Sequence, residues 1–587
     1  MDLFGVLTML GGLAMFLYGM NEMGDGLAKV SGGKLERVLE KLTSNRLMGV
    51  LLGAGVTAVI QSSSATTVMV VGFVNSGIMK LQQAVGVIMG ANIGTTMTSW
   101  ILSLAGVEGG NFFTKLLKPT SFSPILAVIG IAMIMFSNKE KMKDIGKILV
   151  GFAVLMFGMD TMSGAVKPLA DVPEFTSILI MFSNPLLGLL AGAVLTAVIQ
   201  SSSASVGILQ ALCLTGAVGY NTAIPIIMGQ NIGTCVTALL SSIGANKNAR
   251  RAALIHLYFN VIGTVLFMLV FYGLNTVIEF PFMATAANAA GIAVIHTVFN
   301  IFYTLILLPF GNVLVKLACA TVRDDKKDAP QEDVGIQLLD MRFLETPAFA
   351  VEQCKNAAVQ MAQLSRKSLM MAIEMLSHYD ATKAEQVSEL ESKVDRYEDM
   401  LGSYLVKLSA KSLTERDSNE VSMLLHSIGD WERISDHAIN LLEAAKEMYE
   451  KKVEFSGPAK EELRIFTQAL RDIIEKTEKV YVTGDLDLAR NVEPLEEVID
   501  DLNTELKGRH VRRLRKGECT IEMGFIFSDI TTNYERIADH CSNIAVCLIE
   551  VRDNEFDTHE YLDNMKQKDN AEFQKKYAVY KERYQMP

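Results

Sequence analysis

Two identical nine-residue strings contain the residues of this 587-residue chain that are best suited to bind a small solute. Thr57–Ala65 and Thr196–Ala204 both read Thr-Ala-Val-Ile-Gln-Ser-Ser-Ser-Ala, and each places a run of polar residues inside apolar sequence. An unpaired polar group in hydrocarbon costs several kcal/mol, so polar runs at membrane depth usually line a cavity or a binding site. The amides and hydroxyls of Gln61–Ser64 and Gln200–Ser203 are therefore candidate ligands.

The serines of these strings predict that each string begins a half-helix whose N-terminus faces the bound solute. Serine is a strong N-cap, and the first N–H groups of a helix have no internal acceptor. Half-helices that start after Ser64 and Ser203 would aim free donors at a common centre. The strings Asn92-Ile-Gly-Thr95 and Asn231-Ile-Gly-Thr234 predict a second break in each repeat, because glycine permits an unwound backbone. Converging donors of this kind suit a small oxyanion.

The absence of basic residues near the strings predicts a role for a cation. A multiply charged anion bound there would lack a fixed positive partner. Hard cations held by hydroxyl, amide and carbonyl oxygens could supply that charge. This favours Na⁺-coupled transport of an anion, although the same groups could bind a neutral polar solute.

The strings belong to a larger duplication at a shift of 139 residues. Between residues 44 and 65, 16 of 22 positions match their partners without a gap. We therefore predict two repeats, at about 3–137 and 142–276.

The first half of the chain predicts an all-α, polytopic membrane domain over residues 1–317. A membrane-spanning helix needs about 20 mostly apolar residues. Seven segments meet this expectation: 3–20, 83–105, 120–137, 147–165, 222–244, 252–274 and 284–315. Two further apolar stretches, 47–79 and 186–219, hold the polar strings at their centres and predict two re-entrant helix hairpins.

Basic residues predict the orientation of these segments. Lys and Arg cluster after the first span, between the repeats and after 244, which places these loops and the chain beyond Lys316 in the cytoplasm. The two repeats then enter the membrane in opposite senses. Inverted repeats of this kind are typical of secondary transporters, with the substrate site between the repeats.

The charges divide the chain in two. Residues 1–317 hold 17 Lys and Arg against 12 Asp and Glu, a net charge of +5, and the remainder holds 37 against 53, a net charge of −16. The acidic balance of the second half gives no support for nucleic-acid binding. There is no Gly-x-x-x-x-Gly-Lys-Ser/Thr string, so ATP-driven pumping is not expected, and no enzymatic activity is predicted.

The paired polar strings, each followed by Asn-Ile-Gly-Thr, resemble the sodium-dependent phosphate cotransporter family, the type II Na⁺/phosphate transporters. The resemblance covers residues 1–317 and implies that phosphate binds between the repeats. The implied phosphate ligands are Gln61, Ser62, Ser63, Ser64, Asn92, Gln200, Ser201, Ser202, Ser203 and Asn231. The implied Na⁺ ligands are Gln61, Ser62, Thr95, Thr98, Gln200, Ser201, Thr234 and Thr237. Animal members of the family have Ser before the Asn, where this chain has Ala91 and Gln230, so the ion stoichiometry is left open.

A second pattern occurs twice at a spacing of 40 residues, in His256-Leu-Tyr-Phe-Asn260 and His296-Thr-Val-Phe-Asn300. The animal cotransporters have a similar string with an acidic residue at one second position, which is Leu257 or Thr297 here. We expect these His and Asn side chains to pair helices internally.

After a charged linker at 318–344, the second half predicts a soluble six-helix domain at 345–552, followed by a charged tail at 553–587. Apolar residues recur at helical spacing in six segments: 347–378, 381–411, 418–450, 458–482, 488–516 and 520–552. Trp431-Glu-Arg-Ile-Ser-Asp-His437 matches Tyr534-Glu-Arg-Ile-Ala-Asp-His540 at a shift of 103 residues. Two three-helix bundles follow from this duplication.

Carboxylates spaced by four residues share one helix face and could hold metal ions. The duplicated strings resemble the phosphate-uptake regulator PhoU, which implies metal clusters bound by Glu-x-x-x-Asp motifs. The candidate ligands are Glu391, Asp395, Glu432, Asp436, Glu496, Asp500, Glu535 and Asp539. Iron, zinc, manganese and magnesium all remain open. A solvated acidic face is the alternative.

Together these patterns predict an inner-membrane transporter that moves inorganic phosphate with Na⁺ and is regulated by a cytoplasmic PhoU-like domain. The alternatives are a membrane-anchored phosphate sensor, and an exporter of phosphate or another oxyanion. The expected partners are phosphate, Na⁺ and the lipid bilayer, without nucleic acid, and a homodimer is left open.

Overall fold

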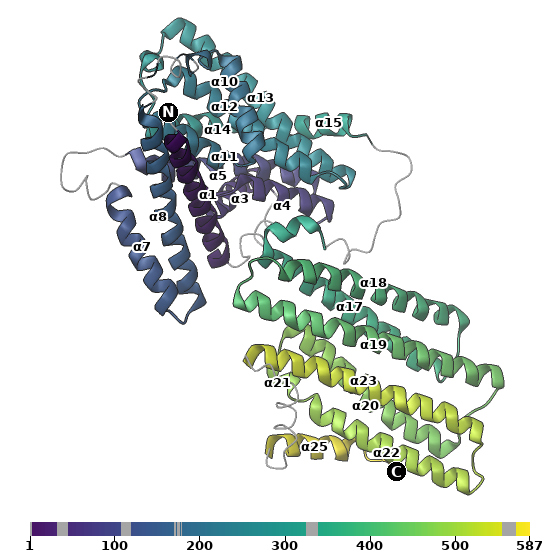
Figure 1. Cartoon of the computed structure of the whole chain (residues 1–587). Coiled ribbons are helices and arrows are strands. Elements are labelled where there is room, and N and C mark those ends of the chain that lie inside the picture. Colours follow the sequence, from purple (N-terminus) through teal and green to yellow (C-terminus); the bar gives the residue numbers. More distant parts are fainter. Residues whose placement is uncertain are drawn as a thin grey trace. The chain divides into compact units, whose positions relative to one another are not determined.

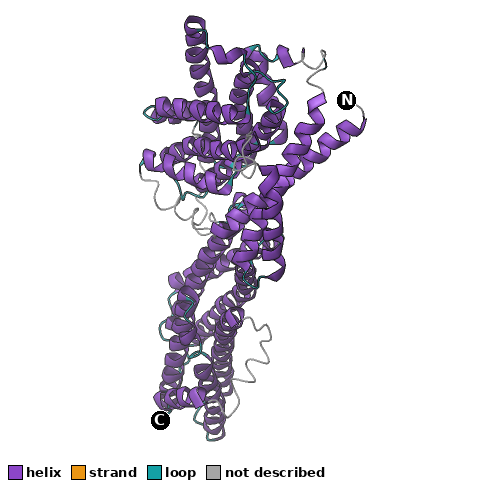
Figure 2. Cartoon of the chain, turned by 90° about the vertical axis from the view of Figure 1, so that its left-hand side faces the viewer, coloured by secondary structure: helices purple, strands orange, loops and turns teal. Residues whose placement is uncertain are grey.

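The chain forms two compact units, which we describe separately. The computed structural model describes residues 3–31, 45–106, 119–168, 172, 177, 179–323, 339–553 and 571–587. Unit 1 comprises Met1–Gln331 and Asp340–Phe349, and unit 2 comprises Glu332–Leu339 and Ala350–Pro587. Apart from an isolated bridge between Gly219 and Ala286, the regular structure of the described residues is helical (Figure 2).

The helices of unit 1 that carry the repeated strings correspond in three pairs at the 139-residue shift; Figure 1 labels them. The pairs are α3 (Arg46–Ile60) with α10 (Pro185–Ile199), α4 (Ser63–Asn75) with α11 (Ser202–Cys213), and α5 (Leu81–Ser103) with α12 (Tyr220–Ser241). We call α3–α4 hairpin 1 and α10–α11 hairpin 2. The helices around them are α1 (Leu3–Ser31), α7 (Pro119–Phe136), α8 (Glu140–Val166), α13 (Lys247–Ile278), α14 (Ala289–Leu307) and α15 (Gly311–Thr321).

Six helices among the described residues are long and apolar enough to cross a membrane. They are α1, α5, α8, α12, α13 and α14, and each overlaps a predicted crossing. The seventh predicted crossing, 120–137, forms the shorter apolar helix α7. The predicted crossing 284–315 is divided into α14 and α15, because Pro309 lies between them and proline cannot continue a helix.

Glycines allow the string-bearing helices to pack closely against α5 and α12. A Cβ atom on Gly90 would lie 2.0 Å from the carbonyl oxygen of Val50, and one on Gly229 would lie 1.9 Å from that of Leu189. These glycines bring the backbones of neighbouring helices into contact, as small residues do in membrane proteins.

The predicted second break in each repeat is wrong. Helices α5 and α12 run without interruption through the Asn-Ile-Gly-Thr strings. Gly94 and Gly233 serve packing instead: a Cβ at Gly94 would lie 2.5 Å from the Ala54 carbonyl oxygen, and one at Gly233 would lie 2.4 Å from that of Ala193. Their small size thus allows the close approach of α3 and α10, and it does not mark an unwound backbone.

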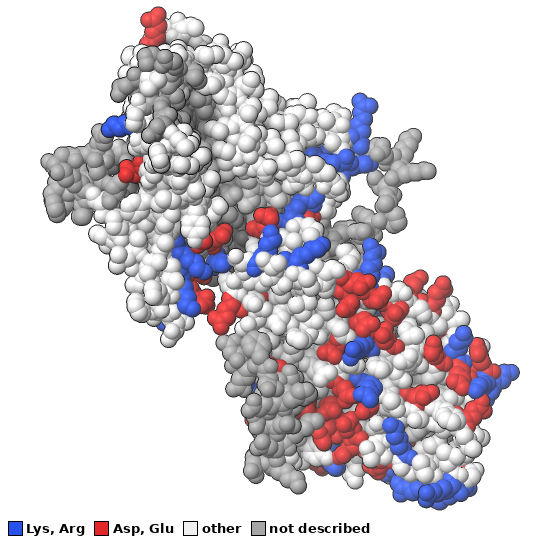
Figure 3. All heavy atoms as spheres, in the orientation of Figure 1, with Lys and Arg blue, Asp and Glu red and all other residues white. Residues whose placement is uncertain are grey.

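Unit 2 contains the six predicted helical segments. Apolar stripes on these helices bury a shared core that includes Trp431, Phe466 and Tyr534. The helices are α17 (Pro347–Met375), α18 (Ala381–Ser409), α19 (Glu415–Lys451), α20 (Gly457–Thr483), α21 (Leu486–Ala489) with α22 (Glu493–Arg515), and α23 (Ile521–Asp553). Figure 3 shows many acidic side chains on the visible face of this unit, in agreement with its net negative charge.

The predicted charged tail of unit 2 contains a further helix. Residues Ala571–Arg583 form α25, which packs beside α22 (Figure 1). Tyr577 and Lys581 of α25 both bond to Asp501, and Arg583 pairs with Asp472 at 3.0 Å. Residues 554–570 of the predicted tail and 324–338 of the predicted linker lie outside the described residues.

Candidate functional site

Each polar string joins the two half-helices of its hairpin. Gln61 and Gln200 adopt left-handed backbone angles, with φ of 60° and 58°, and end α3 and α10. Ser62 and Ser201 then cap the next helices by accepting bonds from the N–H groups of Ala65 and Ala204. The predicted junctions are confirmed, but α4 and α11 begin two residues earlier than predicted, because the first serine of each run is the cap.

The two strings meet. The hydroxyl oxygens of Ser63 and Ser202, which correspond at the 139-residue shift, lie 3.3 Å apart. Ser64 donates to the carbonyl oxygen of Gln200 at 3.3 Å, and Ser203 donates to that of Gln61 at 3.5 Å. Residues that are far apart in sequence therefore form one cluster at the N-termini of α4 and α11.

This cluster presents donors to an anion. The first N–H groups of α4 and α11 have no acceptor within their own helices, and both helix dipoles place partial positive charge there. Among the described residues, no Lys or Arg side chain bonds to either string. The cluster can therefore attract a small oxyanion through helix termini and hydroxyls, without a neutralising cationic side chain.

In hairpin 1 the polar groups satisfy one another. Gln61 is 7% exposed, its amide nitrogen donates to the carbonyl oxygen of Ala58, and its amide oxygen accepts a bond of 2.9 Å from Thr98. Thr57 donates to Thr66 at 3.0 Å. The structure therefore brings together Gln61 and Thr98 of the four first-repeat residues predicted to bind Na⁺.

In hairpin 2 and its neighbour α12, several polar side chains lack hydrogen-bond partners among the described residues. Gln200 is exposed. Four buried oxygens have no hydrogen-bond partner within the described part of the chain: the Thr196, Ser205 and Thr237 hydroxyls and the Gln230 amide oxygen. The amide nitrogen of Gln230 donates to the Ser205 carbonyl oxygen at 3.0 Å, so Gln230 lies against α11. Hydroxyl and amide oxygens of this kind are suitable ligands for a hard cation.

The other predicted ligands bond elsewhere. Thr95 and Thr234 donate to the carbonyl oxygens of Ala91 and Gln230, one turn earlier in their own helices. Asn92 donates to Asn260 at 2.6 Å, and Asn231 donates to Asn300 at 2.8 Å. These Asn side chains thus join α5 to α13 and α12 to α14, as expected for helix-pairing groups.

Sequence reasoning missed Tyr303, whose hydroxyl lies at the centre of this network. It accepts bonds from Asn92 at 2.7 Å and Asn231 at 3.2 Å, and it lies 2.9 Å from the amide oxygen of Asn300. The 40-residue pattern contains the signal, because the residue equivalent to Tyr303 is Gly263. A Cβ on Gly263 would lie 2.3 Å from the Tyr303 ring, so the glycine makes room for a single phenol between the repeats.

The two buried histidines of this pattern have different surroundings. His296 bonds to the Ser99 hydroxyl at 2.7 Å and to the Asn231 amide oxygen at 3.3 Å. Both ring nitrogens of His256 are buried without a partner among the described residues. The residue equivalent to Ser99 in the second repeat is Ala238, which offers no hydroxyl.

Unit 2 contains one close group of potential metal ligands among its described residues. A carboxylate oxygen from each of Glu496, Asp500 and Asp539 lies within 4.8 Å of the others, and Glu496 is buried. Three carboxylates at this spacing suit a hard cation such as Mg²⁺ or Mn²⁺. Helices α22 and α23 thus bring together three of the four residues predicted for the second bundle.

The first bundle holds its acidic residues differently. Burial raises the pKa of Glu432 to about 7, with a further contribution from the neighbouring Asp436 carboxylate. Burial also raises the pKa of Glu391. His437 bonds to Asn533 at 2.7 Å and His540 bonds to Asp430 at 2.8 Å, so both histidines tie α19 to α23.

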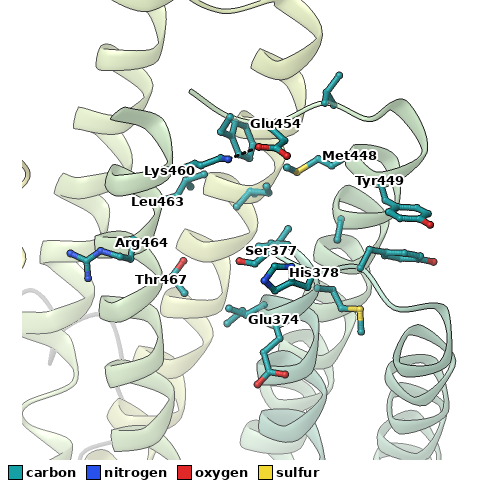
Figure 4. Close-up of a pocket in the computed structure, with 18 of the residues that line it drawn as sticks. Glu374, Ser377, His378, Met448, Tyr449, Glu454, Lys460, Leu463, Arg464 and Thr467 are labelled. Atoms are coloured by element: carbon teal, nitrogen blue, oxygen red, sulfur yellow. Dashed lines mark hydrogen bonds and ion pairs between the residues drawn. The ribbon is translucent and has the colours of Figure 1, made fainter. Parts of the chain in front are cut away.

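A cavity of about 1450 Å³ in unit 2 lies apart from both acidic groups. Residues of α17, α19, α20 and α23 contribute to its lining. Figure 4 shows Lys460 pointing toward Glu454, and Arg464 lies one turn further along α20. Lys460 pairs with Glu454 at 2.6 Å and Arg464 pairs with Glu461 at 2.7 Å. These two cations of the lining are therefore paired with carboxylates of their own surroundings.

Comparison with known protein families identifies both halves of the chain. The family model described as "Na+/Pi-cotransporter" matches residues 15–164 and again 161–295. The model described as "PhoU domain" matches residues 358–445 and 463–548. Both duplications found in the sequence therefore coincide with paired matches to one family model.

Curated relatives cover the chain to different extents. The Escherichia coli (strain K12) protein named "Putative inorganic phosphate export protein YjbB" is 23% identical over 570 residues, which is 95% of this chain and 99% of the relative. The human "Sodium-dependent phosphate transport protein 2B" is 35% identical over 129 residues, 20% of this chain and 19% of the relative. The Thermotoga maritima "Phosphate-specific transport system accessory protein PhoU homolog 1" is 27% identical over 191 residues, 32% of this chain and 82% of the relative.

Proposed function

From the premise that the chain carries Na⁺/Pi-cotransporter domains followed by two PhoU domains, we propose that it transports inorganic phosphate across a cell membrane. It is a membrane protein of a transporter family and not an enzyme. The basic loops support an inner-membrane location with unit 2 in the cytoplasm. On this orientation hairpins 1 and 2 are re-entrant and belong to inverted repeats.

The meeting of the two serine runs is the observation that carries this proposal. A phosphate ion between α4 and α11 would replace the cross-bonds of Ser63, Ser64, Ser202 and Ser203 with bonds to its own oxygens. The free N–H groups of both helix N-termini would add donors. The Asn92 and Asn231 side chains join the surrounding helices, α5 to α13 and α12 to α14.

We propose that net transport is outward, because a relative that covers nearly the whole chain is named as an export protein. The electrical term supports this direction. An inside-negative potential of 100 mV favours the exit of each negative charge by about 2.3 kcal/mol, hence of a divalent anion by roughly 4.6 kcal/mol. Within the described part of the chain, no Lys or Arg side chain bonds to the two strings and could cancel this charge.

Na⁺ coupling is compatible with export if few ions accompany the phosphate. Among the described residues, hairpin 2 and its neighbour α12 contain side-chain oxygens without hydrogen-bond partners. In hairpin 1 the side-chain oxygens of Thr57 and Gln61 are hydrogen-bonded. One Na⁺ with a divalent phosphate leaves one negative charge, whose exit still gains about 2.3 kcal/mol at 100 mV. A tenfold inward Na⁺ gradient opposes this by about 1.4 kcal/mol. The PhoU domains would regulate this flux, with Glu496, Asp500 and Asp539 as the residues that would hold a metal ion.

Phosphate flux in proteoliposomes tests the proposal. Purified protein is reconstituted, the membrane potential is set with K⁺ and valinomycin, and radioactive phosphate is followed with Na⁺ present or absent. We expect a potential that attracts anions out of the vesicle to accelerate phosphate exit. The double variant Ser63→Ala/Ser202→Ala should reduce the flux at least tenfold.

Thr8→Ala, on the exposed face of α1, is the matched control for loss of a hydroxyl. It should leave the flux unchanged. Equal flux in the double variant and the wild type would contradict the site. Binding of phosphate without any flux would indicate a sensor, and inhibition by sulfate as strong as by phosphate would indicate a general oxyanion transporter.

A further inference from the structure

A ten-residue segment that begins within the predicted linker packs onto the C-terminal end of α4 within unit 1. Asp340–Phe349 belongs to unit 1 and includes the short helix η4 (Met341–Glu345), although the chain returns to unit 2 at Ala350. We call this segment the latch. Helix α17 begins at Pro347, so the latch contains the first turn of the helix that leads into the PhoU domains.

Three phenylalanine rings attach the latch to α4. The Phe343 and Phe349 rings lie 5.5 and 5.0 Å from the Phe73 ring, and 4.9 Å from each other. All three side chains are at most 1% exposed. Gly72 makes room for this contact, since a Cβ there would lie 2.7 Å from the Phe343 ring. Aromatic rings stabilise such a contact through their burial and their edge-to-face packing.

Polar bonds fix the register of the latch. Asn75, the last residue of α4, donates to the Asp340 carboxylate at 2.7 Å. Asp340 also pairs with Arg342 at 2.6 Å, and Arg342 donates to the Ser241 carbonyl oxygen at the end of α12 at 2.7 Å. A cation at a helix C-terminus is favourable for the helix dipole. The latch therefore contacts both repeats.

Asn75 connects the latch to the start of α13 as well. Its amide oxygen accepts a bond of 2.9 Å from the Asn246 N–H, and its carbonyl oxygen accepts one of 2.7 Å from the Asn246 side chain. The equivalent residue in the second repeat is Leu214, which cannot make these bonds. The latch and Asn75 thus join hairpin 1 to helices of repeat 2.

We propose that the latch couples the PhoU domains to hairpin 1, holding α4 in place when it is packed and releasing it when α17 withdraws. The N-terminus of α4 carries Ser62–Ser64, and its C-terminus carries Phe73 and Asn75. Since α4 is a continuous helix of 13 residues, a displacement at one end reaches the other. That the coupling controls phosphate flux rests on the proposed function. That the latch holds α4 in place does not.

Amide hydrogen exchange in the full-length protein tests whether the latch holds α4. The Ser76 and Met79 N–H groups bond to the Gly72 and Phe73 carbonyl oxygens next to the latch. Phe343→Ala should raise exchange at residues 72–79 at least tenfold, because it removes the buried ring. Met341→Ala, in the same short helix but 49% exposed, should leave exchange unchanged. Equal protection in Phe343→Ala and wild type would overturn the proposal.

Phosphate flux tests the coupling. Asp539→Asn, which alters the acidic group of the second PhoU domain, should change the flux at least twofold in the wild type and in Met341→Ala. The same substitution should have no effect when combined with Phe343→Ala. An equal effect in both backgrounds, or no effect in the wild type, would overturn the coupling. If no variant moves phosphate at all, the proposed function fails, and the exchange comparison alone decides whether the latch holds α4.

Discussion

Hairpins 1 and 2 share a nine-residue string but differ in its environment. In hairpin 1, Gln61 is buried and bonded on both sides of its amide, whereas Gln200 of hairpin 2 is exposed. Thr57 and Thr66 bond to each other, whereas their equivalents Thr196 and Ser205 have no partner among the described residues. Identical local sequence therefore sets the backbone of both hairpins but not the state of their side chains.

The difference originates in a few neighbours that changed after duplication. Ala91 of α5 corresponds to Gln230 of α12, which bonds to α11. Asn75, which bonds to the latch, corresponds to Leu214, whose apolar side chain cannot make that bond. A transporter with inverted repeats changes access by moving one repeat against the other. If the proposed function holds, one satisfied and one unsatisfied hairpin is the asymmetry expected of a single state in such a cycle.

The largest expected effect separates the two glutamines. Gln200→Ala should reduce phosphate flux at least tenfold in proteoliposomes without lowering the unfolding temperature in detergent, because the side chain is exposed at the site. Gln61→Ala should lower both, since it leaves the buried Thr98 hydroxyl unpaired at a cost of about 1–3 kcal/mol. Equal thermal shifts for the two variants would show that the hairpins are equivalent in solution.

A smaller effect is expected on the Na⁺ dependence of flux. Gln230→Ala removes one of the unpartnered oxygens beside hairpin 2 and should raise the half-saturating Na⁺ concentration about tenfold, which corresponds to one lost ligand of roughly 1.4 kcal/mol. Gln82→Ala, exposed near the start of α5, is the control and should leave it unchanged. An unchanged Na⁺ dependence in Gln230→Ala would place the cation elsewhere.

The two buried histidines, His256 and His296, allow the two repeats to be compared through the stability of the folded protein alone. Ser99→Ala should destabilise the protein by about 1–3 kcal/mol, because it leaves a ring nitrogen of His296 unpaired. Ala238→Ser, at the equivalent position, should stabilise it by about 1 kcal/mol, because it offers His256 the hydroxyl that His296 already has. Unfolding temperatures in detergent measure both. A shift in the same direction for the two variants would contradict the assigned equivalence.

Much of this architecture is predictable from the sequence, because duplication makes weak patterns readable. The repeated strings place both hairpin junctions, since an apolar run interrupted by Gln-Ser-Ser-Ser cannot continue across lipid. Apolar periodicity places the helices of unit 2 because each buries one stripe of its surface. These are local features, and local sequence determines them.

The remaining features depend on contacts between distant segments. Gly94 and Gly233 predict an unwound backbone if they are read locally, but they face the carbonyl oxygens of α3 and α10 and allow close packing. Tyr303 and the latch are visible only once segments far apart in sequence are brought together. The asymmetry of the hairpins is also hidden, because it arises from neighbours such as Gln230 and not from the strings.

The duplicated PhoU domains extend the comparison, with the smallest expected effect. Burial raises the pKa of Glu432 to about 7, above its ordinary value of 4.5. Between these pH values the unfolded chain releases the proton while the folded protein keeps it. Stability from this group is therefore complete below pH 4.5 and is lost as the pH rises to about 7.

A glutamine at position 432 cannot ionise, so Glu432→Gln should remove the loss of stability that occurs as the pH rises to about 7. The unfolding temperature of wild type should fall more between pH 5 and pH 8 than that of Glu432→Gln, followed by the fluorescence of the buried Trp431. Glu443→Gln, exposed on the same helix, controls for the loss of a surface carboxylate. Identical pH profiles for wild type and Glu432→Gln would show that the first bundle does not hold a buried proton. The two bundles would then differ only in the spacing of their carboxylates.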